Sequence, residues 1–258
     1  MLTYTFCHIK GISCTAEKRL WDGGIISWDD YLKNNKRFFS YKKDQFIRKQ
    51  LEISKIALEA DSIDFFFSRL SNEQQVRVYP HFKNKMVFLD IETTGLSIKD
   101  DSITTIAIYN GHTIKNYING QNIWNFIGDI TKYSILVTYN GTKFDIPFLK
   151  KFFGINLNLF HIDLCHVLHN LGYWGGLKEC ERKLGIQRQI EGIDGVQAVQ
   201  LWSYYKNIND NSALKQLILY NSQDVLSLEH IIIKAYNKIM KDCPVSNNIS
   251  LTKQPSLL

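Results

Sequence analysis

Two carboxylates stand two positions apart at the end of an apolar run. Asp90 and Glu92 belong to the stretch Met-Val-Phe-Leu-Asp-Ile-Glu at 86–92, whose first half is long enough for a buried strand. Because side chains in a strand alternate between its faces, both carboxylates point to the same side. A hard divalent cation, Mg²⁺ or Mn²⁺, would relieve their repulsion. The alternative is a strand end that emerges into water with both acids solvated.

A third carboxylate, Asp145, follows the sequence Tyr-Asn-Gly-Thr-Lys-Phe at 139–144. The pattern predicts a strand that ends near Tyr139, a glycine turn, and a helix that begins near Asp145. A carboxylate at a helix N-terminus is stabilised as the anion, so Asp145 is either a helix cap or an acid of the same site.

A fourth carboxylate, Asp224, lies four residues after Tyr220 in a helix-favouring region. One helical turn places the two side chains on the same face. Because Asp is a poor residue for the middle of a helix, its presence needs a reason. A salt bridge to Lys215 or Lys234 is the structural explanation. The functional one is a phenol beside a metal-bound carboxylate, where it orients or deprotonates an attacking water.

In this order the segments resemble the DEDD superfamily of 3′–5′ exonucleases, which have the ribonuclease H-like fold. The matching motifs are Asp-x-Glu-Thr-Thr-Gly-Leu at 90–96, Asn-x-x-x-Phe-Asp at 140–145 and Tyr-x-x-x-Asp at 220–224. The tyrosine is typical of the DEDDy branch, within which the chain is most similar to the YprB-type ribonuclease H-like proteins. That likeness adds residues 161–164, 176–178, 201–202, 220–221 and Glu181, together with the N-terminal Gly-Ile and Leu-Trp pattern. It covers about residues 1–35 and 84–235.

This resemblance implies a two-metal site. Asp90, Glu92 and Asp224 would hold one Mg²⁺ or Mn²⁺, and Asp90 would bridge to a second ion that Asp145 assists through water. Tyr220 would orient the attacking water. The implied reaction removes nucleoside 5′-monophosphates from the 3′ end of a DNA or RNA strand.

Six further residues are expected to contact the terminal nucleotide or its phosphate. Leu96 would act as a wedge against the terminal base, and Lys178 lies at an expected helix start, where phosphates bind. Turn formation and core packing are the structural alternatives for these positions. The candidates are Thr93, Thr94, Leu96, Asn140, Phe144 and Lys178.

The sequence pattern around these residues predicts a sheet flanked by helices. Asn110-Gly111 is a hairpin-turn signal between two of the strands. The expected fold is α/β and ribonuclease H-like, with a mixed five-stranded sheet whose first three strands are antiparallel. Four strands are placed from the sequence, near 86–92, 102–109, 112–118 and 134–139. Helices are expected near 121–131, 144–153, 163–171, 177–184, 195–206, 212–220 and 222–240.

The residues before the sheet have a different pattern. Two short helices joined by Gly23-Gly24 form a helix-hairpin-helix-like start, and a long amphipathic helix follows at 41–60. Such modules offer backbone N–H groups to phosphates; the alternative is a cap that packs its Trp residues on the main domain. The expected division is a helical N-terminal region at 1–80, the exonuclease domain at 84–240 and a flexible tail at 244–258.

Composition excludes several classes of protein. The 258 residues include 31 Lys and Arg against 25 Asp and Glu, a net charge of +6 that suits a nucleic-acid partner. Five scattered cysteines without a Cys-x-x-Cys pair argue against a disulfide framework and for a reducing compartment. Without a signal-peptide pattern or a long apolar run, we expect a cytoplasmic protein with no membrane segment.

Two other kinds of site are considered and set aside. His161, Asp163, Cys165, His166 and His169 crowd together, but they fit a helix cap and core packing better than zinc, so no zinc is expected. Walker, Gly-x-Ser-x-Gly and dinucleotide-binding motifs do not occur in the sequence. The remaining alternatives are a non-catalytic nucleic-acid-binding protein on the same fold and an endonuclease of the ribonuclease H type.

Overall fold

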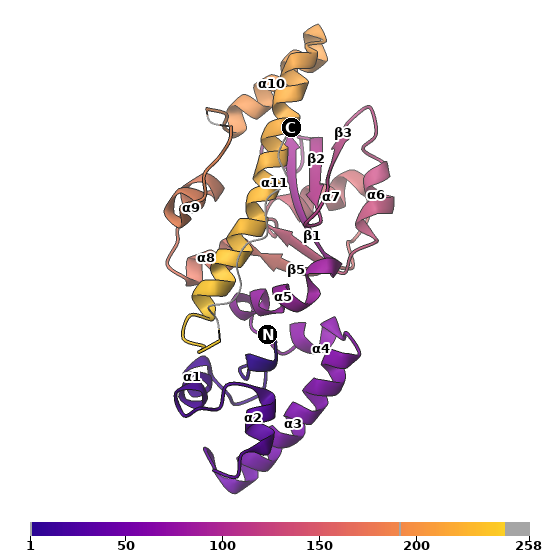
Figure 1. Cartoon of the computed structure of the whole chain (residues 1–258). Helices are drawn as coiled ribbons and strands as arrows, with labels where there is room; N and C mark the ends of the chain where they lie inside the picture. The colour runs from indigo at the N-terminus through magenta and orange to yellow at the C-terminus, as the bar shows by residue number, and fades with distance from the viewer. Residues whose placement is uncertain (1, 191, 246–258) are drawn as a thin grey trace. The chain divides into compact units, whose positions relative to one another are not determined.

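The structure is a computed structural model that describes residues 2–190 and 192–245 (Figure 1). These residues form two compact units, one from 2–83 with 234–245 and the other from 84–190 with 192–233. This division places 234–240 with the N-terminal residues, whereas the sequence analysis expected 84–240 to form one domain. Most of the expected tail, from residue 246 onward, lies outside the described residues.

The N-terminal unit is helical. Its two tryptophans in the short helices are internal: the indole Nε1 of Trp21 donates to the Tyr4 carbonyl at 3.1 Å, and that of Trp28 to the Thr5 carbonyl at 2.8 Å. These Trp side chains therefore pack within their own unit. The elements are η1 (Leu2–Tyr4), α1 (Cys14–Asp22), α2 (Trp28–Lys33), α3 (Tyr41–Glu59), α4 (Ile63–Phe67), η2 (Asn72–Val78) and α5 (Tyr79–Phe82).

The second unit is built on a five-stranded mixed sheet. After η3 (Lys83–Lys85), the strands are β1 (Met86–Thr93), β2 (Ile103–Tyr109), β3 (Ile114–Ile118), β4 (Ile135–Thr138) and β5 (Phe160–Asp163). Their order is β3-β2-β1-β4-β5, with β1, β2 and β3 antiparallel and β4 and β5 parallel to β1. The expected fold class is confirmed. The strand that sequence reasoning did not place is β5, which has only four residues.

The central strand separates an apolar face from a polar one. Val87, Leu89 and Ile91 pack into a core with residues of α6 (Asn125–Ile130) and α7 (Asp145–Phe153). Asp90, between them, points the other way and accepts a hydrogen bond from Asn221 of α11 (Asn211–Ile239). The alternation expected for β1 thus places the carboxylates on the face that α11 covers (Figure 1).

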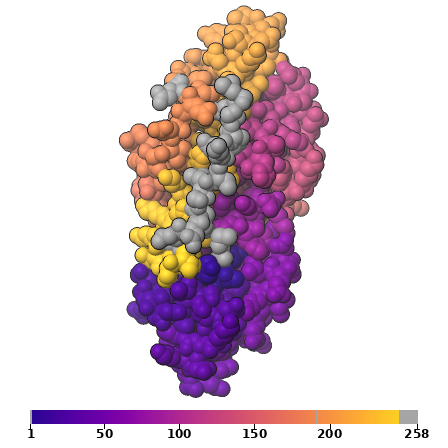
Figure 2. Space-filling model, viewed as in Figure 1, coloured from indigo at the N-terminus to yellow at the C-terminus, as the bar shows by residue number. Residues whose placement is uncertain are grey.

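Three more helices complete this unit: α8 (Leu164–Asn170), α9 (Leu177–Leu184) and α10 (Gly195–Ile208). In the space-filling view, the magenta residues of the sheet and α6 form one side of the unit, and the salmon and orange residues of α8–α10 form the other (Figure 2). Within the described residues, no helix has both the length and the apolar character needed to cross a membrane.

Helix α11 replaces the two helices expected at 212–220 and 222–240. The polar residues that suggested a break at 221–223 are buried and have partners outside the helix. Ser222 Oγ donates to Asn116 Oδ1 at 3.0 Å, and Gln223 Oε1 accepts from the Ile190 backbone N–H at 2.6 Å. Because these contacts satisfy the side chains, they no longer compete with the helix backbone.

Candidate active site

Three carboxylates from two distant segments converge on one side of the sheet. Asp90 and Glu92 come from β1, and Asp224 comes from α11. One carboxylate oxygen from each lies within 4.8 Å of the others, and Asp224 is buried at 5% exposure. Oxygen atoms at this spacing are the ligands that Mg²⁺ and Mn²⁺ prefer. The donor set therefore suits a hard divalent cation.

Asp145 lies beside this cluster without belonging to it. It is the first residue of α7, and its Oδ1 accepts a hydrogen bond of 3.2 Å from the backbone N–H of Ile91, between the two acids of β1. The helix-cap explanation is incomplete: Phe144 occupies the N-cap position, and no side chain caps it. Asp145 is buried at 3% exposure, close enough to raise the pKa values of Asp90 and Glu92.

The turn before Asp145 is tightly specified. Both carboxylate oxygens of Asp163 accept backbone hydrogen bonds from it, from Asn140 at 2.7 Å and from Thr142 at 3.1 Å. Gly141 is required because a Cβ there would lie 2.1 Å from Thr138 Oγ1. Asn140 has a positive φ of 60°, which Asn tolerates better than most residues. These constraints direct the chain into α7 with Asp145 next to β1.

The pKa values of all four acids are raised. Burial is the largest cause, and for Asp90 and Glu92 repulsion from Asp224 comes next. Burial also raises the pKa of Asp224, against the lowering effect of Arg188, and raises the pKa of Asp145 to about 7. Asp145 is therefore partly protonated at neutral pH, and a bound cation would favour the ionised form of all four acids.

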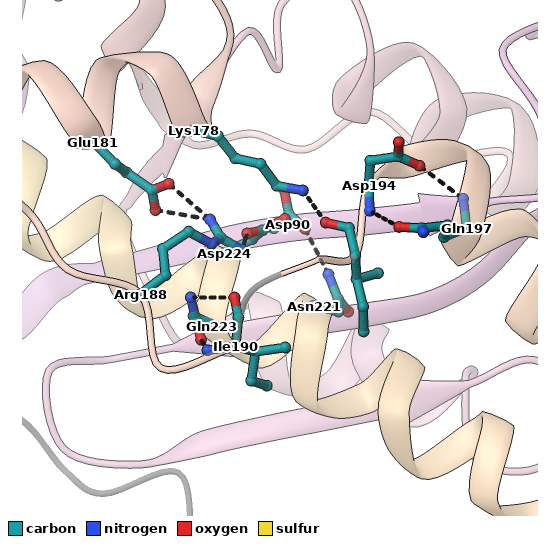
Figure 3. Close-up of polar contacts among 11 residues, drawn as sticks. Asp90, Lys178, Glu181, Arg188, Ile190, Asp194, Gln197, Asn221, Gln223 and Asp224 are labelled. Carbon is teal, nitrogen blue, oxygen red and sulfur yellow. Dashed lines mark hydrogen bonds and ion pairs between the residues drawn. The ribbon is translucent and has the colours of Figure 1, made fainter.

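Asn221 fixes the orientation of Asp90. Its Nδ2 donates to Asp90 Oδ2 at 2.6 Å (Figure 3). Its Oδ1 accepts from Thr105 Oγ1 at 3.2 Å. Asn221 is fully buried, so these two hydrogen bonds link α11 to β1 and β2. Asn221 was indicated from the sequence only through the family resemblance and without a role; in the structure it joins these elements.

Arg188 contacts two acidic residues but was not indicated by the sequence motifs. Its Nη2 donates to Asp224 Oδ1, and its Nη1 donates to both oxygens of Glu181, at 2.9 and 2.7 Å (Figure 3). The expected partners of Asp224, Lys215 and Lys234, are replaced by this guanidinium. Arg188 follows α9 in a loop without periodic pattern, so its sequence position carries no signal; Glu181 was noted only through the family resemblance.

Tyr220 lies next to Asp224, as one helical turn requires. Burial, followed by the negative charge of Asp224, raises the pKa of its phenol above the ordinary value of 10. The phenol therefore keeps its proton at neutral pH and is a hydrogen-bond donor rather than a base. Lys178 Nζ lies 4.8 Å from the centre of the Tyr220 ring and donates to the Ile193 carbonyl.

A cleft of about 870 Å³ opens beside the acids. Leu96 lies on its rim with 85% of its surface exposed, and Asn140 and Phe144 also line it. Thr93 and Thr94 line the cleft too, but both hydroxyls are used in the turn: Thr93 Oγ1 donates to the Gly95 carbonyl and Thr94 Oγ1 to Asp101. Five of the six expected substrate residues are thus cleft residues.

The start of α10 also lines the cleft, although the sequence did not connect this helix with the site. Asp194 caps this helix in a capping box with Gln197, and Val196 is 68% exposed. Val196, Val199 and Gln200 line the same cleft as Leu96. Their only sequence signal was the helix start itself.

The His and Cys residues that were set aside as a zinc site have other contacts. Asp163 caps α8 through the Cys165 backbone N–H at 3.1 Å, besides holding the 140–142 turn. His161 Nε2 lies 2.8 Å from Thr138 Oγ1, and His169 stacks on Trp174 at a centroid distance of 4.4 Å. These residues shape the segments around the acidic cluster.

A family model agrees with this geometry. The RNase_H superfamily model matches residues 87–236, which contain all four acids and Tyr220. The chain belongs to the RNase_H superfamily. This membership confirms the ribonuclease H-like part of the resemblance stated from the motifs and suggests a nuclease; nucleases of this superfamily usually use divalent metals.

Two individual proteins are similar to this superfamily member. The Bacillus subtilis (strain 168) protein YprB, described as uncharacterized, is 30% identical over 188 residues. The match covers 62% of this chain and 44% of YprB, so the chain spans less than half the length of that relative. The structure of the family B DNA polymerase of Pyrobaculum calidifontis has a TM-score of 0.45 at 14% identity, over 61% of this chain and 27% of the polymerase.

Proposed function

We propose that this chain is a 3′–5′ exonuclease of the DEDDy type, which hydrolyses the terminal phosphodiester bond of DNA or RNA and releases nucleoside 5′-monophosphates. The observation that carries the proposal is the convergence of Asp90, Glu92 and Asp224 within 4.8 Å, with Asp145 beside them. A cluster of buried acids with raised pKa values is costly unless cations neutralise it.

Two divalent cations, Mg²⁺ or Mn²⁺, would supply Lewis-acid stabilisation of the attacking and leaving oxygens. Asp90, Glu92 and Asp224 would hold one of them. Asp90 would share the second with Asp145, whose place just outside the three-oxygen cluster fits contact through water. Asn221 keeps Asp90 oriented. Since the Tyr220 phenol retains its proton, it would donate a hydrogen bond that orients the attacking water.

The cleft supports binding of a strand end. Leu96 is exposed on its rim, and Val196 is exposed on the α10 wall, so the two offer apolar surfaces to a terminal base. Lys178 lies close enough to lower the pKa values of Glu92 and Asp224, and it offers positive charge to a phosphate. The net charge of +6 favours the same polyanionic partner.

The test is a panel of 3′- and 5′-labelled DNA and RNA oligonucleotides incubated with Mg²⁺ or Mn²⁺. We expect 5′-labelled strands to shorten one nucleotide at a time and 3′-labelled strands to release labelled mononucleotide at once. A 3′-terminal phosphorothioate should stall the reaction. Internal cleavage of strands with a blocked 3′ end would instead show an endonuclease of the ribonuclease H type.

One observation favours a second candidate, a non-catalytic nucleic-acid-binding protein. The guanidinium of Arg188 already neutralises Asp224, which reduces the need for a cation there. Retained binding of oligonucleotides without any cleavage, with Mg²⁺ and with Mn²⁺, would support this candidate. Arg188→Ala tests this neutralisation. Tighter binding of Mn²⁺ by the variant than by the wild type would show that the guanidinium and the cation compete for Asp224.

A further inference from the structure

A pair of thiols lies in the N-terminal unit, away from the chemistry considered so far. Cys7 is in the turn that follows η1, and Cys14 is the first residue of α1. Their sulfur atoms are within 4.8 Å of each other and of a carboxylate oxygen of Glu17. Cys14 is exposed and Cys7 is partly buried, so one thiol of the pair faces solvent.

Glu17 makes this group a poor metal site. Its Oε1 accepts backbone hydrogen bonds from Phe6 and Cys7, and its Oε2 accepts from Arg77 Nη1 at 2.7 Å. Glu17 and Arg77 are both almost fully buried, with 0% and 2% of their surface exposed. Because its oxygens are committed to these donors, only the two sulfur atoms remain for a ligand. Two thiols without further ligands fall short of the four that zinc requires.

The surroundings activate Cys14 in particular. A hydrogen bond from Cys7 and the positive charge of Arg77 lower the pKa of Cys14 to about 7. The pKa of Cys7 is raised by the same hydrogen bond and by burial, so Cys7 keeps its proton. The position of Cys14 at the start of the nine-residue helix α1 also favours a thiolate. The pair thus combines a nucleophilic thiolate with a neighbouring thiol.

We propose that Cys7 and Cys14 form a reversible disulfide when the protein meets a peroxide. The Cys14 thiolate attacks the peroxide, so that an S–O bond forms, the O–O bond breaks and the departing hydroxide takes up a proton as water. The Cys7 thiol then attacks the sulfenic sulfur: the S–S bond forms, the S–O bond breaks, and the hydroxide leaves with the Cys7 proton as a second water. The two thiols are oxidised and the peroxide is reduced.

The disulfide would close a ring over the turn at 7–14. This turn contains Gly11, with a φ of +87°, and lines a cavity of about 640 Å³ together with Arg69 of the segment after α4. Lys43 Nζ donates to the Gly11 carbonyl at 2.9 Å, so α3 already holds the turn from one side. A transient disulfide of this kind is compatible with the reducing compartment expected from the cysteine count.

Trypsin makes the test direct because Lys10 separates the two cysteines and Lys18 ends the second peptide. The full-length protein is treated with hydrogen peroxide, alkylated and digested. We expect peptides 1–10 and 11–18 to be recovered joined, with the loss of two hydrogens, and to separate after reduction. Cys243→Ser is the matched control, since Cys243 is a buried cysteine of the same unit, and should behave like the wild type.

Single variants assign the roles. In Cys7→Ser, Cys14 should be recovered as a sulfenic acid trapped by dimedone; in Cys14→Ser, Cys7 should remain a free thiol after the same exposure. Recovery of both wild-type peptides unlinked and alkylated, under peroxide that oxidises Cys14 in Cys7→Ser, would overturn the proposal. So would stoichiometric Zn²⁺ binding that is lost in the double variant Cys7→Ser/Cys14→Ser and that prevents the disulfide.

Discussion

Buried carboxylates occur in both units of the molecule, and their surroundings differ. In the N-terminal unit, Glu17 has one arginine and two backbone N–H groups as partners. In the second unit, Asp90, Glu92, Asp145 and Asp224 lie together, and Arg188 serves Asp224 while also serving Glu181. Lys178 is the other nearby positive charge. The first arrangement is balanced, and the second is negative in excess.

This difference separates a structural charge from a functional one. In a buried pair of opposite charges, the attraction outweighs the cost of desolvation only when the hydrogen-bond geometry is good. Removal of one partner leaves the other charge buried without a counter-charge. Burial, followed by repulsion from the neighbouring carboxylates, raises the pKa values of Asp90 and Glu92, and a cation relieves both effects. Variants in the two regions should therefore fail in different ways.

The largest effect is expected from Asp90→Asn. The change removes the carboxylate that both cations would share and should lower the rate of 3′ trimming by at least about 10⁴-fold. Because the amide keeps the shape of the side chain and removes one repelling charge, the melting temperature without metal should not fall. Single-turnover kinetics and thermal unfolding measure the two outcomes. Loss of folding together with loss of activity would contradict this expectation, because it would show that Asp90, like Glu17, is needed for the fold.

Tyr220→Phe should have the next effect. The phenol would donate a hydrogen bond that orients the attacking water, so its loss should slow cleavage by roughly 10²–10³-fold, the range for a lost hydrogen-bond donor in an active site. Binding of a 3′-labelled oligonucleotide in Ca²⁺, measured by fluorescence anisotropy, should be unchanged. Trimming at the wild-type rate would reassign Tyr220 to packing beneath Lys178 and Arg188.

Glu17→Gln tests the buried pair of Glu17 and Arg77 in the N-terminal unit. The buried Arg77 loses its counter-charge, which should lower the free energy of unfolding by about 3 kcal/mol in urea denaturation. The matched control is Glu179→Gln, which breaks an exposed pair with Arg182 and should leave stability unchanged. An equal decrease in the free energy of unfolding in both variants would show that the buried pair contributes no more to stability than the exposed pair.

The smallest effect concerns pH. The acids of the second unit have raised pKa values in the folded state, about 7 for Asp145, against about 4 in an unfolded chain. The folded, metal-free protein therefore binds more protons between pH 4 and 7, and its stability should fall as pH rises through that window. We expect a melting temperature roughly 5–10 °C lower at pH 8 than at pH 5.

Two additions sharpen the pH measurement. Saturating Mg²⁺ should remove most of the decrease, since the cation replaces the protons. Asp145→Asn should make the metal-free profile shallower, because the amide does not titrate while the other three acids still do. A melting temperature that rises steadily from pH 5 to pH 8 without metal would show that the four acids are not held with excess charge.

The fold class and the proximity of the four acids could be predicted from the sequence, because both depend on local sequence patterns. Alternation along 86–92 gave β1 its two faces, and Asn110-Gly111 gave the antiparallel pairing of β2 with β3. The order of the three motifs along the chain indicated that Asp145 and Asp224 lie near Asp90 and Glu92. Each of these inferences needed only neighbouring residues or a known spacing.

What the sequence could not predict depends on contacts between distant segments. Arg188 reaches Asp224 from a loop, 36 residues away in the chain. The single helix α11 persists through 221–223 because Asn116 and Ile190 satisfy its polar side chains. The strands β4 and β5 both have four residues, but β4 begins with the apolar run Ile-Leu-Val, whereas His161 and Asp163 interrupt β5. The pattern of β5 therefore does not distinguish it from a loop.

The central claim is that Asp90, Glu92 and Asp224 share bound divalent cations. Isothermal titration of Mn²⁺ into the wild type and Asp224→Asn tests it without a substrate. The account predicts saturable binding by the wild type, tighter at pH 8 than at pH 6, and its loss in the variant. Mn²⁺ binding of equal affinity and stoichiometry in both proteins would contradict it.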